Sequence, residues 1–279
     1  MNRLSTERRG QVISCLVEGM SIRSTVRVTG VTKNTIAKLL GELGGACSEY
    51  QDSTLRNLSC DRFECDEIWS FIGAKEAHVM PEHPDDYGDV WTWTAIDAET
   101  KLVPSWLVGQ RDARDCYTFL YDLRSRLQPG RIQITTDGLN SYLQVIEPLF
   151  GADRVDFAQL VKMYENTDTE RRYSPARCAG IDKRTITGRP DPALISTSYV
   201  ERQNLTIRMG MRRFTRLTNA HSKKVENHTA AVSLHFMHYN FARVHETLTK
   251  RAGRKTTPAM AAGVEAHPWS VTQIAGLLD

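Results

Sequence analysis

The sequence predicts a mixed α/β fold preceded by a small all-α module, and three observations support this prediction. Apolar side chains over the first 45 residues show only helical spacing. From Arg62 the spacing changes to the two-residue alternation of strands, and helical segments then alternate with strands. With 279 residues, the chain has room for one large core and one small additional module.

The N-terminal 45 residues are expected to form three short helices. Residues 4–18 have apolar side chains at helical spacing. Ser21 is a suitable N-cap for a second helix that runs through Val28, and Gly30 makes a turn. Thr32 is a suitable N-cap for a third helix over 33–43. This order is the outline of a helix-turn-helix.

A helix-turn-helix places its last helix in the major groove of DNA. The side chains then expected near base edges or phosphates lie at the start of the third helix: Lys33, Asn34, Thr35 and Lys38. A small helical packing or dimerisation module is the alternative interpretation of the same pattern.

The rest of the chain is expected to form a sheet with helices packed on it. The strands are expected at 62–72, 90–96, 102–108, 131–136 and 155–164, with helices at 112–127 and 139–150 and another from about Thr197 to beyond Arg208. Three strands, helix, strand, helix, strand, helix is the order of the ribonuclease H-like fold, a mixed sheet flanked by helices. The fold alone does not specify a function.

Composition changes along the chain suggest four parts. These are a helix-turn-helix DNA-binding domain at 1–45, a small and polar linker at 46–60, a ribonuclease H-like domain at 61–245 and a C-terminal basic tail and helix at 246–279. A polar segment at about 165–192 is interpreted as a basic insertion that contacts DNA or a partner subunit, or as a solvated loop. Its cations are Arg171, Arg172, Arg177, Lys183, Arg184 and Arg189.

Several classes of protein are disfavoured. No apolar run approaches the roughly 18 residues of a membrane span, and the first residues do not resemble a secretory signal, so a cytoplasmic, nucleoid-associated protein without a membrane partner is expected. Six scattered cysteines form no C-x-x-C pair, and therefore no zinc is predicted. The net charge of +3 is small, but positions 201–224 hold seven Lys or Arg and a single acid, Glu201. A polyanion is expected to bind there.

Three separated acids occupy positions that this architecture brings together. Asp66 lies in the first strand, Asp137 ends the fourth strand, and Glu201 lies on the later helix. Two divalent ions about 3.5–4 Å apart can activate an attacking oxygen and stabilise a leaving oxygen at a phosphodiester. Mg²⁺ or Mn²⁺ takes carboxylate ligands, so we expect Asp66 to bridge two ions, Asp137 to bind one and Glu201 the other.

Each acid also has a structural interpretation. Asp66 sits in an otherwise apolar strand, where an unpaired charge costs several kcal/mol. Asp137 is placed to cap the following helix, and Glu201 to complement a helix dipole. The remaining nearby acids are interpreted as solvated surface, with Glu67 on the sheet face opposite Asp66: Asp61, Glu67, Asp85, Asp86, Asp112 and Asp115.

The helix that carries Glu201 is expected to contact DNA. Asn204, Arg208 and Arg212 follow at i+3, i+7 and i+11 and share one helical face with Glu201. The full set of DNA-contacting candidates in this region is Arg202, Asn204, Arg208, Arg212, Arg213, Arg216, Lys223 and Lys224.

Three segments carry a resemblance to a known family. CDEIWSFIGAK, TTDG and YVERQNLTIRMGMRRFTRLTNAHSK resemble the catalytic blocks of the insertion sequence 1 family of DDE transposases, and the tail HYNFARVHETLTKRAGRKTTPAMAAG is similar to the end of many integrase-like transposases. The resemblance implies catalytic roles for Asp66, Asp137 and Glu201, a ribonuclease H-like fold, magnesium or manganese, and terminal inverted repeats as the bound DNA. The sequence departs from the family pattern in two ways. It lacks a zinc finger, and a gap of 64 positions separates Asp137 from Glu201.

These observations favour a transposase that hydrolyses the phosphodiester at element ends and then joins the 3′-hydroxyl ends to target DNA. Because two ends are joined together, at least a homodimer on double-stranded DNA is expected. The alternatives are a ribonuclease H-like nuclease that cuts without joining, and a helix-turn-helix repressor with an inactive catalytic domain. Metal-dependent joining distinguishes the transposase from the nuclease, and any metal-dependent cleavage excludes the repressor.

Overall fold

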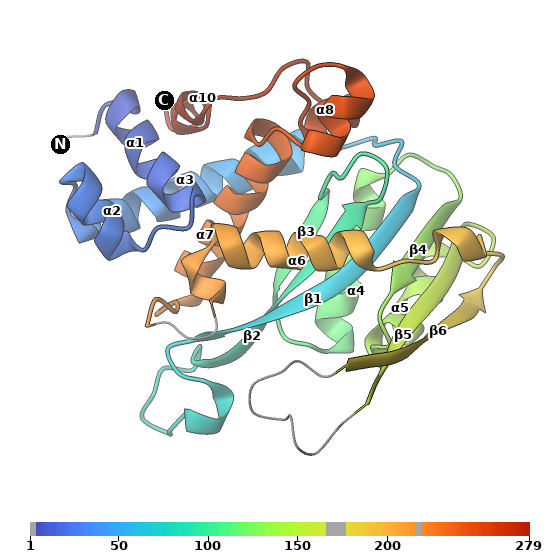
Figure 1. The fold of residues 1–279 in the computed structure, drawn as a ribbon. Coiled ribbons are helices and arrows are strands. Elements are labelled where there is room, and N and C mark those ends of the chain that lie inside the picture. Colours follow the sequence, from blue (N-terminus) through green and yellow to red (C-terminus); the bar gives the residue numbers. More distant parts are fainter. Residues whose placement is uncertain (1–3, 166–176, 216–218) are drawn as a thin grey trace.

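The computed structural model describes residues 4–165, 177–215 and 219–279. Its centre is a six-stranded mixed sheet of order β3-β2-β1-β4-β5-β6 (Figure 1). The strands are β1 Arg62–Ile72, β2 Gly88–Asp97, β3 Ser105–Gly109, β4 Ile132–Thr136, β5 Val155–Glu165 and β6 Arg177–Thr187. β4 is parallel to β1 and β5, and the other pairs are antiparallel. The predicted mixed α/β, ribonuclease H-like fold is confirmed.

Helices cover both faces of this sheet. α4 Ala113–Arg126 and α5 Asn140–Phe150 lie behind the sheet in Figure 1, and α6 Ser198–Gly210 crosses in front. The rear layer is apolar, because Trp93 of β2 packs against Phe119 of α4 and Tyr142 of α5. Short helical turns complete the region at η1 Glu76–His78, η2 Pro192–Leu194 and η3 Arg212–Phe214.

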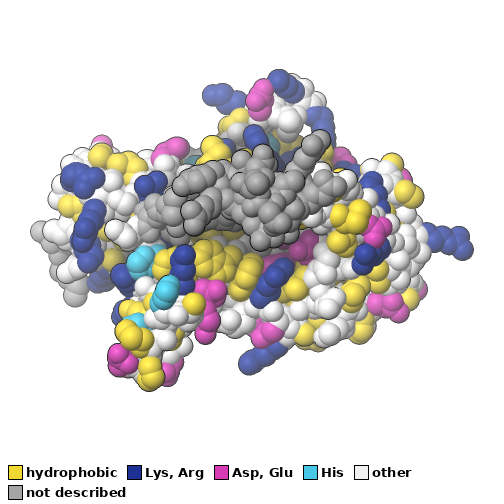
Figure 2. Space-filling view, turned by 60° about the horizontal axis from the view of Figure 1, so that its bottom comes forward, with side chains coloured by type: hydrophobic (Ala, Val, Ile, Leu, Met, Phe, Trp, Pro, Cys, Tyr) yellow, Lys and Arg dark blue, Asp and Glu magenta, His cyan; other side chains and the backbone are white. Residues whose placement is uncertain are grey.

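The N-terminal helices begin where the sequence predicts. They are α1 Thr6–Val17, α2 Ile22–Thr29 and α3 Lys33–Thr54, and the side chains of Ser21 and Thr32 cap α2 and α3. Gly30 ends α2 with a positive φ of 70°, which suits glycine. In Figure 2 these helices lie at the left, where Lys and Arg side chains stud the surface.

α3 is twice as long as the sequence predicts and continues into the segment expected as a linker at 46–60. The helix continues through Thr54 and packs along α7 Val225–Met237. Small residues just past the expected end of this helix permit close contact with α7: a Cβ on Gly44 would lie 2.5 Å from Ala230. Ser233 Oγ also donates to the Gly44 carbonyl oxygen at 2.8 Å.

The segment expected as a basic tail, 246–279, is folded onto the N-terminal helices. After α7 the chain forms a π-helical turn at His238–Ala242 and then α8 Glu246–Ala252, α9 Pro258–Ala261 and α10 Val271–Gly276. α10 packs against α1, where buried Arg9 pairs with the side chain of Asp279. One buried cluster includes Ile13, Leu43, Phe63 and Phe236, so the N-terminal helices share a core with the sheet.

Part of the expected basic insertion at 165–192 is a strand. Residues 177–187 form β6, which pairs with β5 at the edge of the sheet. The polar run RCAGIDKRTIT lacks the apolar alternation of a half-buried strand, which is why the sequence pattern did not reveal it. Arg171 and Arg172 lie outside the described residues. No helix in the described parts of the chain combines the length and apolarity needed to cross a membrane.

Candidate active site

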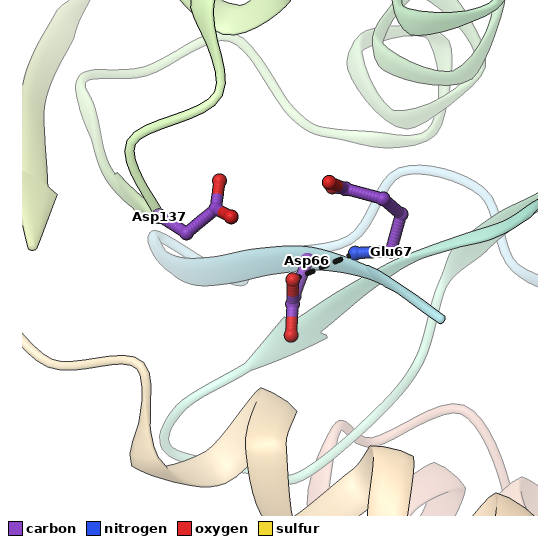
Figure 3. Close-up of side chains that lie close together, drawn as sticks. All are labelled: Asp66, Glu67 and Asp137. Atoms are coloured by element: carbon purple, nitrogen blue, oxygen red, sulfur yellow. Dashed lines mark hydrogen bonds between the residues drawn. The ribbon is translucent and has the colours of Figure 1, made fainter. Parts of the chain in front are cut away.

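Two of the three predicted acids meet at neighbouring strands. β1 and β4 run parallel with Cys65 opposite Thr136, so the next residues, Asp66 and Asp137, lie side by side. Ligand oxygens of Asp66, Glu67 and Asp137 lie within 4.8 Å of one another (Figure 3). The structure therefore assembles an acidic cluster at the predicted place, with Glu67 as its third member.

Asp66 points toward α6, away from the carboxylates of Glu67 and Asp137 (Figure 3). Asn204 Nδ2 donates to Asp66 Oδ2 at 2.8 Å, and the backbone N–H of Glu67 donates to Oδ1 at 2.9 Å. Asn204 is only 5% exposed. In this structure the Asn204 amide holds the Asp66 carboxylate, and a contact of Asn204 with DNA stays a prediction.

Glu67 lies on the opposite face of β1, as the strand period predicts, but it is not solvated surface. Its side chain is 1% exposed. Arg111 Nε donates to Oε1 at 2.7 Å, and the Tyr142 hydroxyl donates to Oε2 at 3.2 Å. These partners come from the loop before α4 and from α5, so they satisfy a buried carboxylate that the strand pattern alone assigns to solvent.

Asp137 follows the last residue of β4 and is partly exposed. Its Oδ1 accepts the backbone N–H of Leu139 at 3.0 Å, a local turn of the kind that Asp favours at the start of a helix. Its Oδ2 lies 3.8 Å from Arg111 Nη2. Asp137 thus forms a local turn before α5 rather than the helix cap considered for it, since the N-cap of α5 is Leu139, and its second oxygen is directed to the acidic cluster.

Glu201 lies on the same side of the sheet as Asp66, because Asn204, one helical turn later on α6, bonds to Asp66. It is not a member of the cluster found among the described residues. Its carboxylate accepts two hydrogen bonds from Lys162 Nζ, at 2.5 and 2.6 Å, and one from Thr197 Oγ1 at 2.6 Å. The third predicted acid is therefore close to Asp66 but engaged by a lysine.

The cluster is electrostatically strained. The pKa of Asp66 is raised to about 7. Burial is the largest cause, and the charges of Glu67 and Asp137 contribute to the same shift. Burial, followed by the charge of Asp137, raises the pKa of Glu67 to about 7, although Arg111 lowers it. Crowded carboxylates of this kind favour a proton or a bound cation. The oxygen-only donor set fits a hard divalent ion such as magnesium or manganese.

The predicted DNA-contacting residues fall into two groups. Most are exposed: Lys33, Asn34, Thr35 and Lys38 at the start of α3, Arg202 and Arg208 on α6, and Arg212, Lys223 and Lys224 after it. Arg212 does not continue the α6 stripe as expected, because that helix ends at Gly210 and Arg212 begins a short 3₁₀ turn.

Arg213 is an inward-facing exception. It donates from Nη1 to Ser222 Oγ at 2.7 Å, and burial lowers its pKa to about 10. Its guanidinium supports the turn after α6 rather than an exposed backbone contact. Arg216 lies outside the described residues.

Three site residues were missed by sequence reasoning: Arg111, Tyr142 and Lys162. A lysine inside the β-rich run VDFAQLVKMYE was a signal, since strand interiors rarely hold an unpaired cation. Arg111 and Tyr142 gave no comparable signal, because an arginine before a helix cap and a tyrosine on an amphipathic helix are ordinary residues in those places.

Comparison with known proteins identifies a DDE domain. Residues 88–185 match the model of a DDE domain of the IS240 transposase type. The matched range contains Asp137, whereas Asp66 and Glu201 lie outside it. This match covers less than half of the chain; it supports the predicted DDE transposase, and membership of the insertion sequence 1 family stays a prediction. No curated protein matches the chain.

Solved transposase structures are only loosely similar. The Mos1 transposase paired-end complex with left transposon end is 12% identical, with 51% of this chain and 55% of that chain covered and a TM-score of 0.21. The piggyBac transposase synaptic complex with hairpin DNA is 10% identical, with 99% and 71% covered and a TM-score of 0.40. The chain thus spans about half the length of the Mos1 chain, and similarity at these scores does not bear on its activity.

Proposed function

Because the chain carries the DDE domain of a transposase on a ribonuclease H-like sheet, we propose that it cleaves DNA at the ends of an insertion sequence and joins the 3′-hydroxyl ends to target DNA. The observation that supports this most directly is that ligand oxygens of Asp66 and Asp137, from neighbouring parallel strands, lie within 4.8 Å of each other. Phosphodiester transfer requires a concentration of negative ligands that can hold cations against a phosphate.

Asp66 and Asp137 are the residues that would hold a divalent metal, with Glu201 as the third ligand. Two magnesium or manganese ions, when bound, supply an activated oxygen nucleophile and neutralise charge at the phosphate. The ion pair between Lys162 and Glu201 has to open before Glu201 can serve as a ligand.

The surrounding residues orient and balance these acids. Asn204 holds the Asp66 carboxylate through one oxygen, which sets its direction toward α6. Arg111 contacts both Glu67 and Asp137, so it offsets part of the negative charge when no cation is bound. Both Glu67 oxygens are already bonded, to Arg111 and Tyr142, and Glu67 is therefore assigned a supporting role rather than a ligand role.

DNA is the proposed partner, bound as terminal inverted repeats and as target. The exposed start of α3, with Lys33 and Lys38, is the proposed recognition surface, and Arg202 and Arg208 on α6 are proposed to contact the backbone near the acidic cluster. Because two ends are joined in concert, at least a homodimer on DNA is proposed. The proposed cellular location of the protein is the bacterial nucleoid.

A strand-transfer assay tests the proposal with double-stranded DNA that carries the flanks of the chain's own gene. Wild-type protein with Mg²⁺ is expected to nick the ends and join them to a target. Asp137→Asn is expected to retain end binding and to lose both steps, whereas Asp153→Asn, an exposed acid before β5, keeps them. Cleavage without joining indicates a nuclease, binding without cleavage indicates a repressor, and full activity of Asp137→Asn refutes the site.

A further inference from the structure

A cavity of about 820 Å³ lies between the N-terminal helices and the segment that follows α6. One wall comes from the end of α1, the start of α2 and the start of α3, with Arg23 and Lys33. The other wall comes from the turn after α6 and from α7, with Arg212 and Lys223. Its volume is in the range of ligand-binding pockets. We refer to it as the interhelical groove.

The described charged residues that line the interhelical groove are all of one sign. Five of its described lining residues are Lys or Arg, and no described lining residue is Asp or Glu. The chain as a whole has 36 basic and 33 acidic residues, so a lining of one sign differs from the rest of the protein. The four cations Arg23, Lys33, Arg212 and Lys223 are exposed. Clefts lined by one sign of charge concentrate ligands of the opposite sign, and here the ligand is an anion.

The two helices that begin at this groove add to its positive character. Neither α2 nor α3 has an acidic residue in its first turn, and Arg23 and Lys33 stand there instead. A helix start is the positive end of the helix dipole, where an acid stabilises and a cation does not. The cations are therefore placed against the local preference, which is expected if an external anion completes the site.

The walls are held at a fixed distance from Glu201, the proposed third metal ligand. Gly19, with a φ of 76°, lies so close to α6 that a Cβ there would be 2.7 Å from the Met209 carbonyl oxygen. α6 runs from Glu201 to this contact, and ten residues of helix span about 15 Å. At about 3.4 Å of duplex axis per nucleotide of one strand, that distance corresponds to roughly four or five nucleotides of double-stranded DNA.

We propose that the interhelical groove binds the phosphodiester backbone of a DNA strand roughly four or five nucleotides from the phosphate held beside Glu201. This inference rests on the proposed function and extends it. The same stretch of DNA would contact both the N-terminal helices and the catalytic sheet, so end recognition would set the position of the cut. The groove has the volume to hold a few phosphates of one strand, and both of its walls carry cations that can pair with them.

Binding without metal tests the groove separately from catalysis. Arg23→Gln/Arg212→Gln removes one cation from each wall, and Arg154→Gln removes an exposed arginine at the start of β5, at the opposite end of the sheet from Asp137. Fluorescence anisotropy with labelled end DNA in EDTA is measured over a range of salt. Because each lost phosphate contact lowers the salt slope by about 0.7–0.9, the double variant is expected to lose about 1.4–1.8 and Arg154→Gln nothing.

Phosphate ethylation locates the contact. In wild-type protein, ethylation roughly four or five nucleotides from the cleaved bond is expected to interfere with binding, and the interference is expected to vanish in the double variant. An unchanged salt slope in a folded double variant, or interference elsewhere only, overturns the groove while leaving the cleavage result for Asp137→Asn intact. If the double variant unfolds, Lys223→Gln alone is measured, with an expected slope loss of about 0.7–0.9.

Discussion

Lys162 on β5 donates two hydrogen bonds to Glu201 on α6, at 2.5 and 2.6 Å. It therefore pairs with the third acid of the predicted catalytic set. Burial lowers the pKa of Lys162, but the hydrogen bond and charge of Glu201 outweigh that effect, and the net pKa is raised. The lysine is therefore charged at neutral pH and competes with any cation that Glu201 would bind.

Removing that charge is expected to tighten metal binding. Lys162→Gln should bind Mn²⁺ up to about fivefold more tightly in the absence of DNA, because a partly exposed ion pair is worth about 0–1 kcal/mol. Titration calorimetry measures the change, with Lys183→Gln on β6 as the control. Unaltered Mn²⁺ affinity together with weaker DNA binding would show that Lys162 serves the substrate instead.

Asn204 and its neighbour Arg202 on α6 should separate metal binding from DNA binding. Asn204→Ala leaves Asp66 Oδ2 without its donor, and loss of such a supporting hydrogen bond commonly costs 10–100-fold in metal affinity or activity. DNA affinity without metal should be unchanged. Arg202→Gln, at an exposed position, should weaken DNA binding and leave Mn²⁺ affinity alone. Equal effects of both variants on both measurements would contradict these assignments.

The acidic cluster predicts an unusual pH dependence for the metal-free protein. The pKa of Asp66 is about 7 in the folded protein and near 3.8 when unfolded, so the folded state holds more protons between these values. This contribution to the free energy of unfolding is present below pH 4 and is lost as pH rises toward 7, with a slope of at most about 1.4 kcal/mol per pH unit.

Urea unfolding in EDTA at several pH values measures this effect as the difference between wild type and Asp66→Asn, which lacks the titration. The wild type should lose stability relative to the variant from pH 4 to 7. Mg²⁺ should restore wild-type stability most strongly at the upper end, where the carboxylates are ionised. A difference that does not vary with pH would mean that Asp66 titrates normally.

Local signals explain which parts of this molecule could be predicted from the sequence. The caps of Ser21 and Thr32, the limits of β1, and the placement of Asp66 beside Asp137 each depend on a short stretch of residues with a strong preference. Their partners are either adjacent in sequence or brought together by the order of strands. These features appeared in the structure as expected.

Partners distant in sequence explain the rest. Glu67 appeared solvated because its partners Arg111 and Tyr142 are 44 and 75 positions away. Lys162 lies 39 positions before Glu201, and no pattern in either segment links the two. β6 is polar because it is an edge strand, so only its pairing with β5 reveals it. In each case the determining contact is tertiary, and local periodicity does not identify the partner.

The continuous α3 can be tested with three glycines of the same helix. Gly44→Ala places a Cβ 2.5 Å from Ala230 of α7 and should destabilise the protein by about 1–3 kcal/mol through overpacking. Gly41 and Gly45 have open space at the same atom, so alanine there should stabilise the helix by about 0.5–1 kcal/mol. Urea unfolding measures all three. If α3 ended at Leu43, as the sequence predicts, Gly45→Ala and Gly44→Ala would behave alike, and the opposite signs expected here require the helix to continue past Leu43 along α7.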